Sequence, residues 1–196
     1  MKTGLYFGSF NPIHIGHMAI ANYVAEYSDL REIWFVVSPH NPLKSKYSLL
    51  PDHHRIRLAE LAIGNDTRFR VSDIETKLPR PSYTIDTLTY LKAQNSNREF
   101  CLIMGGDNLL TLHKWKNIED IIREYPLYVY PRKEENVRIT PDLELIISQA
   151  DITLVNAPQM EISGTFIREA VKAGKDIRHF LPPGVWKYII DMHFYE

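Results

Sequence analysis

The stretch GSFNPIHIGH, residues 8–17, places two histidines three residues apart directly after a short apolar run. Residues three apart on a helix share one face, so a helix that starts near His14 presents His14 and His17 side by side. The free N–H groups and the positive dipole end of that helix start attract anions. Gly8 lets the backbone turn tightly and approach a ligand closely, and Gly16 leaves room between the two rings. We interpret the stretch as a cradle for a polyphosphate.

Two other interpretations of the histidine pair have to be weighed. The first is a pair of surface histidines on an ordinary helix, and the second is a pair of metal ligands. The position of the pair after a strand, a glycine and Pro12 favours the phosphate cradle over a solvated helix face. No nearby Cys, Asp or third His completes a ligand set, so the sequence predicts no metal held by the protein itself.

A second candidate for anion binding is ISGTFIRE, residues 162–169. Ser163 and Thr165 are residue types that cap helix starts, and a capped helix start is another anion site. Arg168 lies one turn into that helix, where its guanidinium can fork onto phosphate oxygens. The alternative is a capped surface helix with a solvated arginine.

Three further polar residues follow predicted strands. Asp107 comes after Gly105 and Gly106 and can accept hydrogen bonds from ribose hydroxyls, although it could instead cap the next helix. Lys44 follows the second predicted strand and can reach a phosphate, although most loop lysines are solvated. Arg132, just after the YVYP run, is a weaker candidate for the same positive cluster.

The fold that positions these candidates can be predicted from the pattern of apolar residues. Apolar β-prone runs alternate with amphipathic segments along the chain. The expected strands are 4–7, 32–38, 69–75, 99–105, 126–132 and 151–155; the expected helices are 17–27 with its start near His14, 52–64, 84–95, 118–125, 164–174 and 183–195. This order predicts a Rossmann-like, doubly wound α/β fold with a mainly parallel sheet and helices on both faces. Ligands of such sheets bind beyond the carboxyl ends of the strands, which is where the candidates lie.

Composition narrows the class of protein. The 196 residues suggest one domain, 1–196, and a net charge of −1 argues against a broad basic face for nucleic acid. The single cysteine, Cys101, allows no internal disulfide and fits a reducing cytoplasm. Gly8 and Pro12 come too early for a signal peptide, and no apolar run approaches the ~18 residues of a membrane span. We expect no membrane partner, and the sequence leaves open whether copies associate as a homo-oligomer.

The two motifs together resemble the signatures of the nucleotidyltransferases named for their H-x-G-H motif. Within that superfamily three segments resemble the nicotinate-nucleotide adenylyltransferases: SPHNPLK (38–44), RPSYTIDTLTYL (80–91) and LIMGGDNLLTLHKWKNIEDII (102–122). The resemblance covers almost the whole chain and is weakest at roughly 133–150. It implies a single nucleotidyltransferase domain that joins ATP, bound with Mg²⁺, to nicotinate mononucleotide in NAD biosynthesis.

The resemblance also implies roles for individual residues. The catalytic residues would be His14, His17 and Arg168. Those that bind ATP would be Gly8, Ser9, Phe10, His14, His17, Gly105, Asp107, Ile162, Ser163, Thr165 and Arg168. Those that bind nicotinate mononucleotide would be Lys44, Tyr83, Thr84, Asp86, Thr87, Trp115 and Arg132. An indole face can stack on a pyridine ring, although Trp115 could equally be a core aromatic.

Three residues depart from the family pattern, and several alternative functions have to be considered. Ser9 and Asn11 stand where the family usually has Thr and Asp, and Gly164 stands where Ser is frequent; the effect of Asn11 and Gly164 is open. Nicotinamide mononucleotide or phosphopantetheine are alternative substrates, and cytidylyltransferases and class I tRNA synthetases share the histidines. A non-catalytic nucleotide-binding module on the same fold is a further reading, since fold alone does not fix function.

Overall fold

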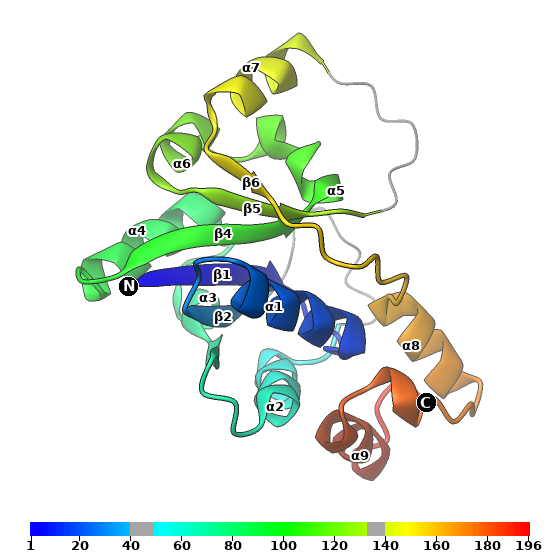
Figure 1. The fold of residues 1–196 in the computed structure, drawn as a ribbon. Helices are drawn as coiled ribbons and strands as arrows, with labels where there is room; N and C mark the ends of the chain where they lie inside the picture. Colours follow the sequence, from blue (N-terminus) through cyan, green and yellow to red (C-terminus); the bar gives the residue numbers. More distant parts are fainter. Residues whose placement is uncertain (40–48, 133–139) are drawn as a thin grey trace.

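In the computed structural model, which describes residues 1–39, 49–132 and 140–196, six strands form one sheet in the order β3-β2-β1-β4-β5-β6 (Figure 1). The strands are β1 (Lys2–Gly8), β2 (Glu32–Val37), β3 (Phe69–Ser72), β4 (Glu99–Gly105), β5 (Leu127–Tyr130) and β6 (Ile152–Leu154). Every neighbouring pair is parallel. The prediction of a Rossmann-like, doubly wound α/β fold is confirmed.

The sheet is buried on both faces because successive residues of its central strands alternate between two apolar clusters. One cluster contains Tyr6, Phe35 and Ile103, and the other contains Leu5, Trp34 and Leu102. The first cluster is covered by helices α1 (Ile15–Tyr27), α2 (Asp52–Ile63), α8 (Gly164–Lys172) and α9 (Pro183–Asp191). The second is covered by α3 (Ile74–Lys77), α4 (Thr84–Gln94), α6 (Ile118–Glu124) and α7 (Pro141–Gln149).

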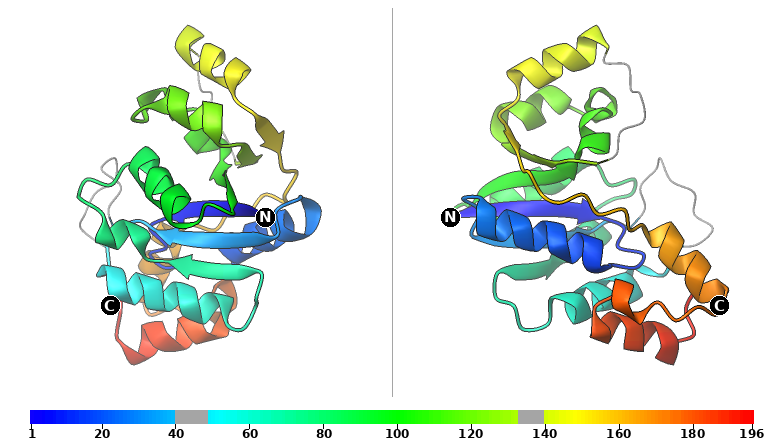
Figure 2. Two further views of the ribbon diagram at one scale, coloured as in Figure 1. Left: turned by 90° about the vertical axis from the view of Figure 1, so that its left-hand side faces the viewer. Right: turned by 45° about the vertical axis from the view of Figure 1, so that its right-hand side comes forward.

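The short elements α5 (Gly106–Leu109), η1 (Leu112–Lys114) and η2 (Arg178–Phe180) complete the described structure. Helix α9 lies alongside α2 in both views of Figure 2, and Gly184 packs against Leu61 there. Across the described ranges, no helix has both the length and the apolar character that a bilayer crossing requires.

One prediction about the order of elements is wrong. We expected the strands at 126–132 and 151–155 to follow each other directly, but helix α7 lies between β5 and β6 and makes them parallel. Its start has a clear cause, because Thr140 accepts a hydrogen bond from the Leu143 N–H (3.4 Å) and Pro141 occupies the first helical position. The predicted strand 69–75 also ends at Ser72, and the last predicted helix ends at Asp191.

The strand order reverses between β1 and β4. The candidate site lies at this reversal. The chain leaves β1 at Gly8 toward α1 on one face, and leaves β4 at Gly105 toward α5 and α6 on the other. A crevice at such a reversal, beyond the carboxyl ends of the strands, is where ligands of this architecture bind. The extended connection after β6 then brings α8 beside the start of α1 (Figure 1).

Candidate active site

The loop between β1 and α1 is shaped by Phe10. Its ring is buried and folds back over Gly8, where an added Cβ would lie 2.8 Å from ring atoms. The backbone of Phe10 is left-handed, with φ 44°. The same ring packs edge-to-face on Tyr6 and His17, with centroids 5.8 and 5.2 Å apart. Glycine is therefore required at position 8 by the Phe10 ring, in addition to any approach of a ligand.

The two histidines meet as predicted at the start of α1. His14 is the N-cap residue, and its ring stacks on that of His17 with centroids 3.7 Å apart. The backbone N–H of His14 donates to Nδ1 of His17 (3.2 Å). Because that nitrogen accepts, the proton of a neutral His17 ring lies on Nε2. The backbone therefore sets the tautomer in which Nε2–H is a donor for an anion.

His14 is buried and neutral. Burial, followed by the nearby charge of Arg132, lowers the pKa of His14 from 6.5 to about 4. Its Nδ1 has no hydrogen-bond partner among the described residues. A Cβ on Gly16 would lie 3.0 Å from this nitrogen, so Gly16 makes room for the His14 ring. The expected space between the two rings is absent, because the rings stack on each other.

Acidification is expected to destabilise the fold through His14. The folded pKa of about 4 lies below the ordinary 6.5, so between these values the unfolded chain takes up a proton that the folded chain does not. This contribution to the free energy of unfolding, up to roughly 3 kcal/mol, is fully present above the ordinary pKa of 6.5. It is lost as the pH falls from there toward the folded-state pKa of about 4. Urea unfolding of the wild type and of His14→Asn measures it. From about pH 7 to about pH 5 the wild type should lose roughly 2 kcal/mol more than the variant, and equal losses would contradict a neutral, buried His14.

The second motif begins α8 and contacts the first. Ser163 accepts a hydrogen bond from the Phe166 N–H (3.1 Å), so its predicted capping role is confirmed. Arg168 donates through Nη1 to the backbone oxygen of Asn11 (2.8 Å) and through Nη2 to the Thr165 hydroxyl (3.2 Å). The two helix starts therefore lie at one corner of the molecule.

Gly164, the departure in the second motif, has a steric reason. An added Cβ would lie 3.0 Å from the backbone oxygen of Asn11 and 3.1 Å from Nη1 of Arg168. A backbone atom cannot move aside as a flexible side chain can, so a larger residue would push α8 away from the loop. The missing side chain allows the second motif to approach the first.

Asn11, the departure in the first motif, accepts two hydrogen bonds at Oδ1. The donors are the Leu50 N–H (3.2 Å) and the Tyr195 hydroxyl (2.8 Å). Asn11 is itself buried, and a neutral amide oxygen satisfies both donors without burying a negative charge. Burial of Tyr195 raises the pKa of its hydroxyl, which keeps it a donor.

Asp107 and Arg132 lie together at the ends of β4 and β5. Arg132 Nη1 contacts Oδ2 of Asp107 at 3.1 Å. Gly105 is the N-cap of α5 and Asp107 lies in its first turn, so Asp107 is not the cap. A Cβ on Gly105 would lie 2.4 Å from Oδ1 of Asp107, so a larger residue there would displace the Asp107 carboxylate from this position. Since Arg132 also lowers the pKa of His14, it lies on the side of the histidines.

A pocket of about 280 Å³ opens beside this corner. It is lined by Gly8 and Ser9 of the first loop together with Tyr83, Thr84 and Trp115, so three predicted pyridine-nucleotide residues lie beside the predicted ATP loop. Arg132 does not line it. A larger hollow of about 600 Å³ borders the opposite end of the sheet and contains none of the candidate site residues.

Asp86 and Thr87 are engaged with other side chains. Asp86 forms an ion pair with Lys116 (3.0 Å), and the Lys116 ammonium lies 4.5 Å from the centre of the Tyr83 ring. Thr87 is fully buried and donates to Glu75 (2.9 Å). Direct contact of Asp86 and Thr87 with a substrate stays a prediction. Lys44 lies outside the described residues.

Glu75 and Arg55 were not identified from the sequence. Glu75 lines the pocket, and burial raises the pKa of its carboxyl although three hydroxyls donate to it. Arg55 is fully buried within α2. A signal for Arg55 was available, because it shares the apolar face of that helix with Leu58 and Ala59, three and four residues on.

Comparison with known proteins places this chain among nucleotide-transferring enzymes. A family model described as Cytidylyltransferase-like matches residues 5–170. The chain is 52% identical over 199 aligned residues to a probable nicotinate-nucleotide adenylyltransferase of Flavobacterium johnsoniae, with all of both chains covered. It is 53% identical to the protein of the same name in Flavobacterium psychrophilum, again over the whole of both chains.

A solved structure has the same fold. The nicotinic acid mononucleotide adenylyltransferase of Plasmodium falciparum, complexed with NaAD, aligns with a TM-score of 0.79 over 99% of this chain and 97% of that chain, at 22% identity. At this identity the likeness concerns the architecture alone.

Proposed function

This chain belongs to the Cytidylyltransferase-like family and, within it, to the nicotinate-nucleotide adenylyltransferases, and we propose that the corner where its two motifs meet is the catalytic site. The protein transfers the adenylyl group of ATP to nicotinate mononucleotide, forming nicotinate adenine dinucleotide and pyrophosphate in NAD biosynthesis. Its substrates are small molecules. The observation that carries the site proposal is the Arg168 to Asn11 contact of 2.8 Å, which joins the two anion-binding helix starts.

The reaction needs alignment more than proton transfer. A 5′-phosphate oxygen of the mononucleotide attacks the α-phosphorus of ATP in line, and the bond from that phosphorus to the β-phosphate oxygen breaks as pyrophosphate leaves. The attacking phosphate is already ionised near neutral pH, so no general base is required. The protein has to hold two anions in register and neutralise the charge that builds up.

We assign the ATP contacts from this requirement. His17 would donate from Nε2 to the α-phosphate, and the neutral His14 would donate to the phosphates beside Ser9 and the Phe10 backbone. Arg168 has five N–H donors, of which two are engaged with described residues, so donors remain for the β- and γ-phosphates. The other proposed ATP contacts are Gly8, Gly105, Asp107, Ile162, Ser163 and Thr165, with Asp107 reaching a ribose hydroxyl.

Mg²⁺ would enter this site with ATP. Within the described ranges no three His, Cys, Asp or Glu side chains gather as a ligand set. Mg²⁺ prefers phosphate oxygens, water and one or two carboxylates to a cage made by protein, so the residues present fit an ion held mainly by the triphosphate. Its chemistry there would be to neutralise negative charge on the phosphates.

We assign the pyridine ring to the pocket lined by Tyr83, Thr84 and Trp115. Replacing Trp115 with alanine is expected to raise the KM for nicotinate mononucleotide roughly 10- to 100-fold, because stacking of a base on an aromatic ring contributes about 1–3 kcal/mol. The KM for ATP should stay within about threefold. Trp115→Phe, which keeps an aromatic face, is the control and should recover most of the affinity. A similar rise of both KM values in Trp115→Ala would contradict a pyridine site at this position.

The activity is tested by mixing the protein with ATP, Mg²⁺ and a mononucleotide and measuring pyrophosphate release. We expect kcat/KM for the nicotinate form to exceed that for the nicotinamide form, because N–H donors and local positive charge favour a carboxylate. Phosphopantetheine should give no pyrophosphate. ATP binding without turnover of either mononucleotide would instead indicate a nucleotide-binding module. A cytoplasmic location stays a prediction, and the association of copies as a homo-oligomer stays an open question.

A further inference from the structure

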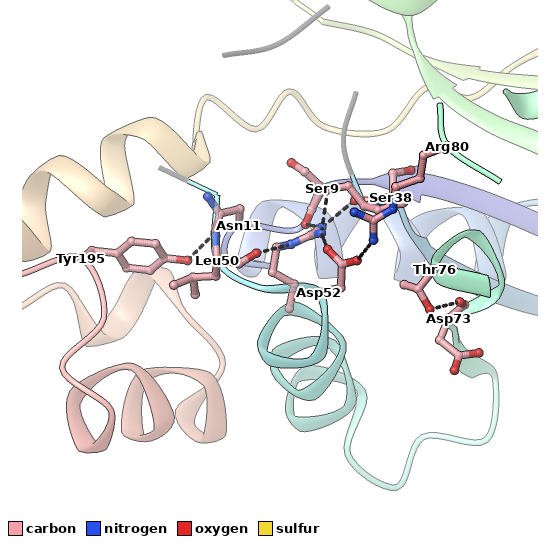
Figure 3. Close-up of polar contacts among 11 residues, drawn as sticks. Ser9, Asn11, Ser38, Leu50, Asp52, Asp73, Thr76, Arg80 and Tyr195 are labelled. Carbon is pink, nitrogen blue, oxygen red and sulfur yellow. Dashed lines mark hydrogen bonds and ion pairs between the residues drawn. The ribbon is translucent and has the colours of Figure 1, made fainter. Parts of the chain in front are cut away.

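Arg55 is at the centre of a hydrogen-bond network behind the loop between β1 and α1. Its partners Ser9, Ser38, Leu50 and Asp52 are labelled in Figure 3. Its side chain comes from the first turn of α2 and is fully buried. Four backbone carbonyl oxygens accept hydrogen bonds from its guanidinium: those of Ser9 (2.6 Å), Ser38 (2.6 Å), Leu50 (2.9 Å) and Pro39 (3.1 Å). Hydrogen bonds from a charged donor are roughly twice as strong as neutral ones.

The four carbonyl groups come from three segments that carry or flank the site. Ser9 lies in the loop after β1, and Ser38 and Pro39 follow the neighbouring strand β2. Leu50 comes just before α2, and its N–H holds the side chain of Asn11. One rigid, planar group therefore fixes the ends of two adjacent strands and the loop that contains the histidines. A lysine has only one nitrogen with which to reach four separated oxygens.

Asp52 extends this network toward the pyridine pocket. Its Oδ1 accepts from Arg55 (2.6 Å) and its Oδ2 accepts from Arg80 (2.7 Å). Arg80 precedes Tyr83 and Thr84, which line the pocket. The continuous path from Ser9 through Arg55 and Asp52 to Arg80 links the ATP loop to the segment that begins the other substrate's pocket.

We propose that Arg55 is a positioning residue for adenylyl transfer, and that the Arg55–Asp52–Arg80 bridge sets the distance between the ATP loop and the pyridine pocket. The inference rests on the proposed function. An in-line attack requires that the two substrates are aligned. A mutation far from the chemistry that misplaces the reacting atoms by about 1 Å can lower the rate roughly 100-fold. Each substrate would still find its own contacts when the bridge is broken, so the effect falls on kcat more than on either KM.

Asp52→Asn is the main test, since it keeps the shape of the side chain and weakens both charged contacts. We expect kcat to fall roughly 10- to 100-fold while both KM values stay within about threefold. Arg80→Met breaks only the outer, exposed contact and should lower kcat by about 3- to 10-fold. Because the two changes remove one shared contact, the double variant should be no more than about twofold slower than Asp52→Asn alone.

Arg57→Met is a matched control on the same helix. Arg57 is exposed and pairs with Glu60 at 3.1 Å, so its loss should leave kcat within about twofold of wild type. Arg55→Lys keeps the charge but not the planar fork, and it should lower kcat at least as much as Asp52→Asn. Thermal unfolding of every variant identifies any that do not fold. If Arg55→Lys does not fold, the variants at Asp52 and Arg80 still test the proposal, because these two side chains are less buried than that of Arg55.

The outcomes separate this inference from the proposed function. If the wild type releases no pyrophosphate with nicotinate mononucleotide, the proposed function fails first. If the wild type is active and folded Asp52→Asn keeps its kcat within about twofold, the bridge has no positioning role. Additive losses in the Asp52→Asn, Arg80→Met double variant would equally overturn it, because independent sites add and a shared contact does not.

Discussion

Replacing His17 with alanine is expected to slow turnover by roughly 10²–10³-fold without unfolding the protein, because one well-placed donor to developing charge contributes that much to catalysis. The structure specifies which atom is responsible. Nδ1 accepts from the His14 backbone N–H at 3.2 Å, so the donor to the α-phosphate is Nε2–H. The measurement is kcat with both substrates saturating, alongside thermal unfolding of the same preparation.

Two amide variants of His17 separate its two nitrogens. Asparagine places an oxygen near the position of Nδ1 and can keep the contact with the His14 N–H, but it has no donor near Nε2. Glutamine places its amide near Nε2 instead. We expect His17→Asn to be as slow as His17→Ala and His17→Gln to recover about tenfold. A His17→Ala enzyme within threefold of wild type would remove His17 from this role.

Replacing Arg168 with alanine is expected to lower kcat/KM for ATP by roughly 10²–10³-fold. Two effects combine here. The guanidinium is lost as a fork for the leaving phosphates, and its contact with the Asn11 backbone oxygen at 2.8 Å is lost as well. Steady-state kinetics with varied ATP measures the loss, which should fall on ATP much more than on the mononucleotide.

Arg168→Lys distinguishes charge from geometry. Lysine keeps the positive charge but cannot hold Asn11, Thr165 and a phosphate at the same time. We expect it to recover no more than about tenfold of the loss in kcat/KM. Full recovery with lysine would mean that a point charge suffices, and that the contact between the two motifs has no part in ATP binding.

Both helix starts could be predicted because each depends on local features. The His14 and His17 spacing, the glycines of the first motif and the Ser163 cap are all readable within ten residues of sequence, and the structure places them as expected. The strands were recognisable because parallel strands buried on both faces are continuous apolar runs. Helix α7 was missed in the region of weakest resemblance, although its Thr140 cap and Pro141 were typical signals.

The network behind the site could not be predicted, because its partners are distant in sequence. Asn11 is held by Leu50 and by Tyr195 near the other end of the chain. An arginine on an amphipathic helix is usually solvated, and no local pattern states that the carbonyls of Ser9 and Ser38 converge on Arg55. Such convergence depends on the packing of α2 against the strand ends.

The central claim is that the two helix starts bind one nucleoside triphosphate between them. A crystal structure with Mg²⁺ and an ATP analogue that cannot be cleaved between the α- and β-phosphates tests it directly. We predict that His17 Nε2 and the Arg168 guanidinium contact phosphates of the same molecule. An analogue held by one motif while the other faces solvent, or one bound in a different pocket, would contradict the account.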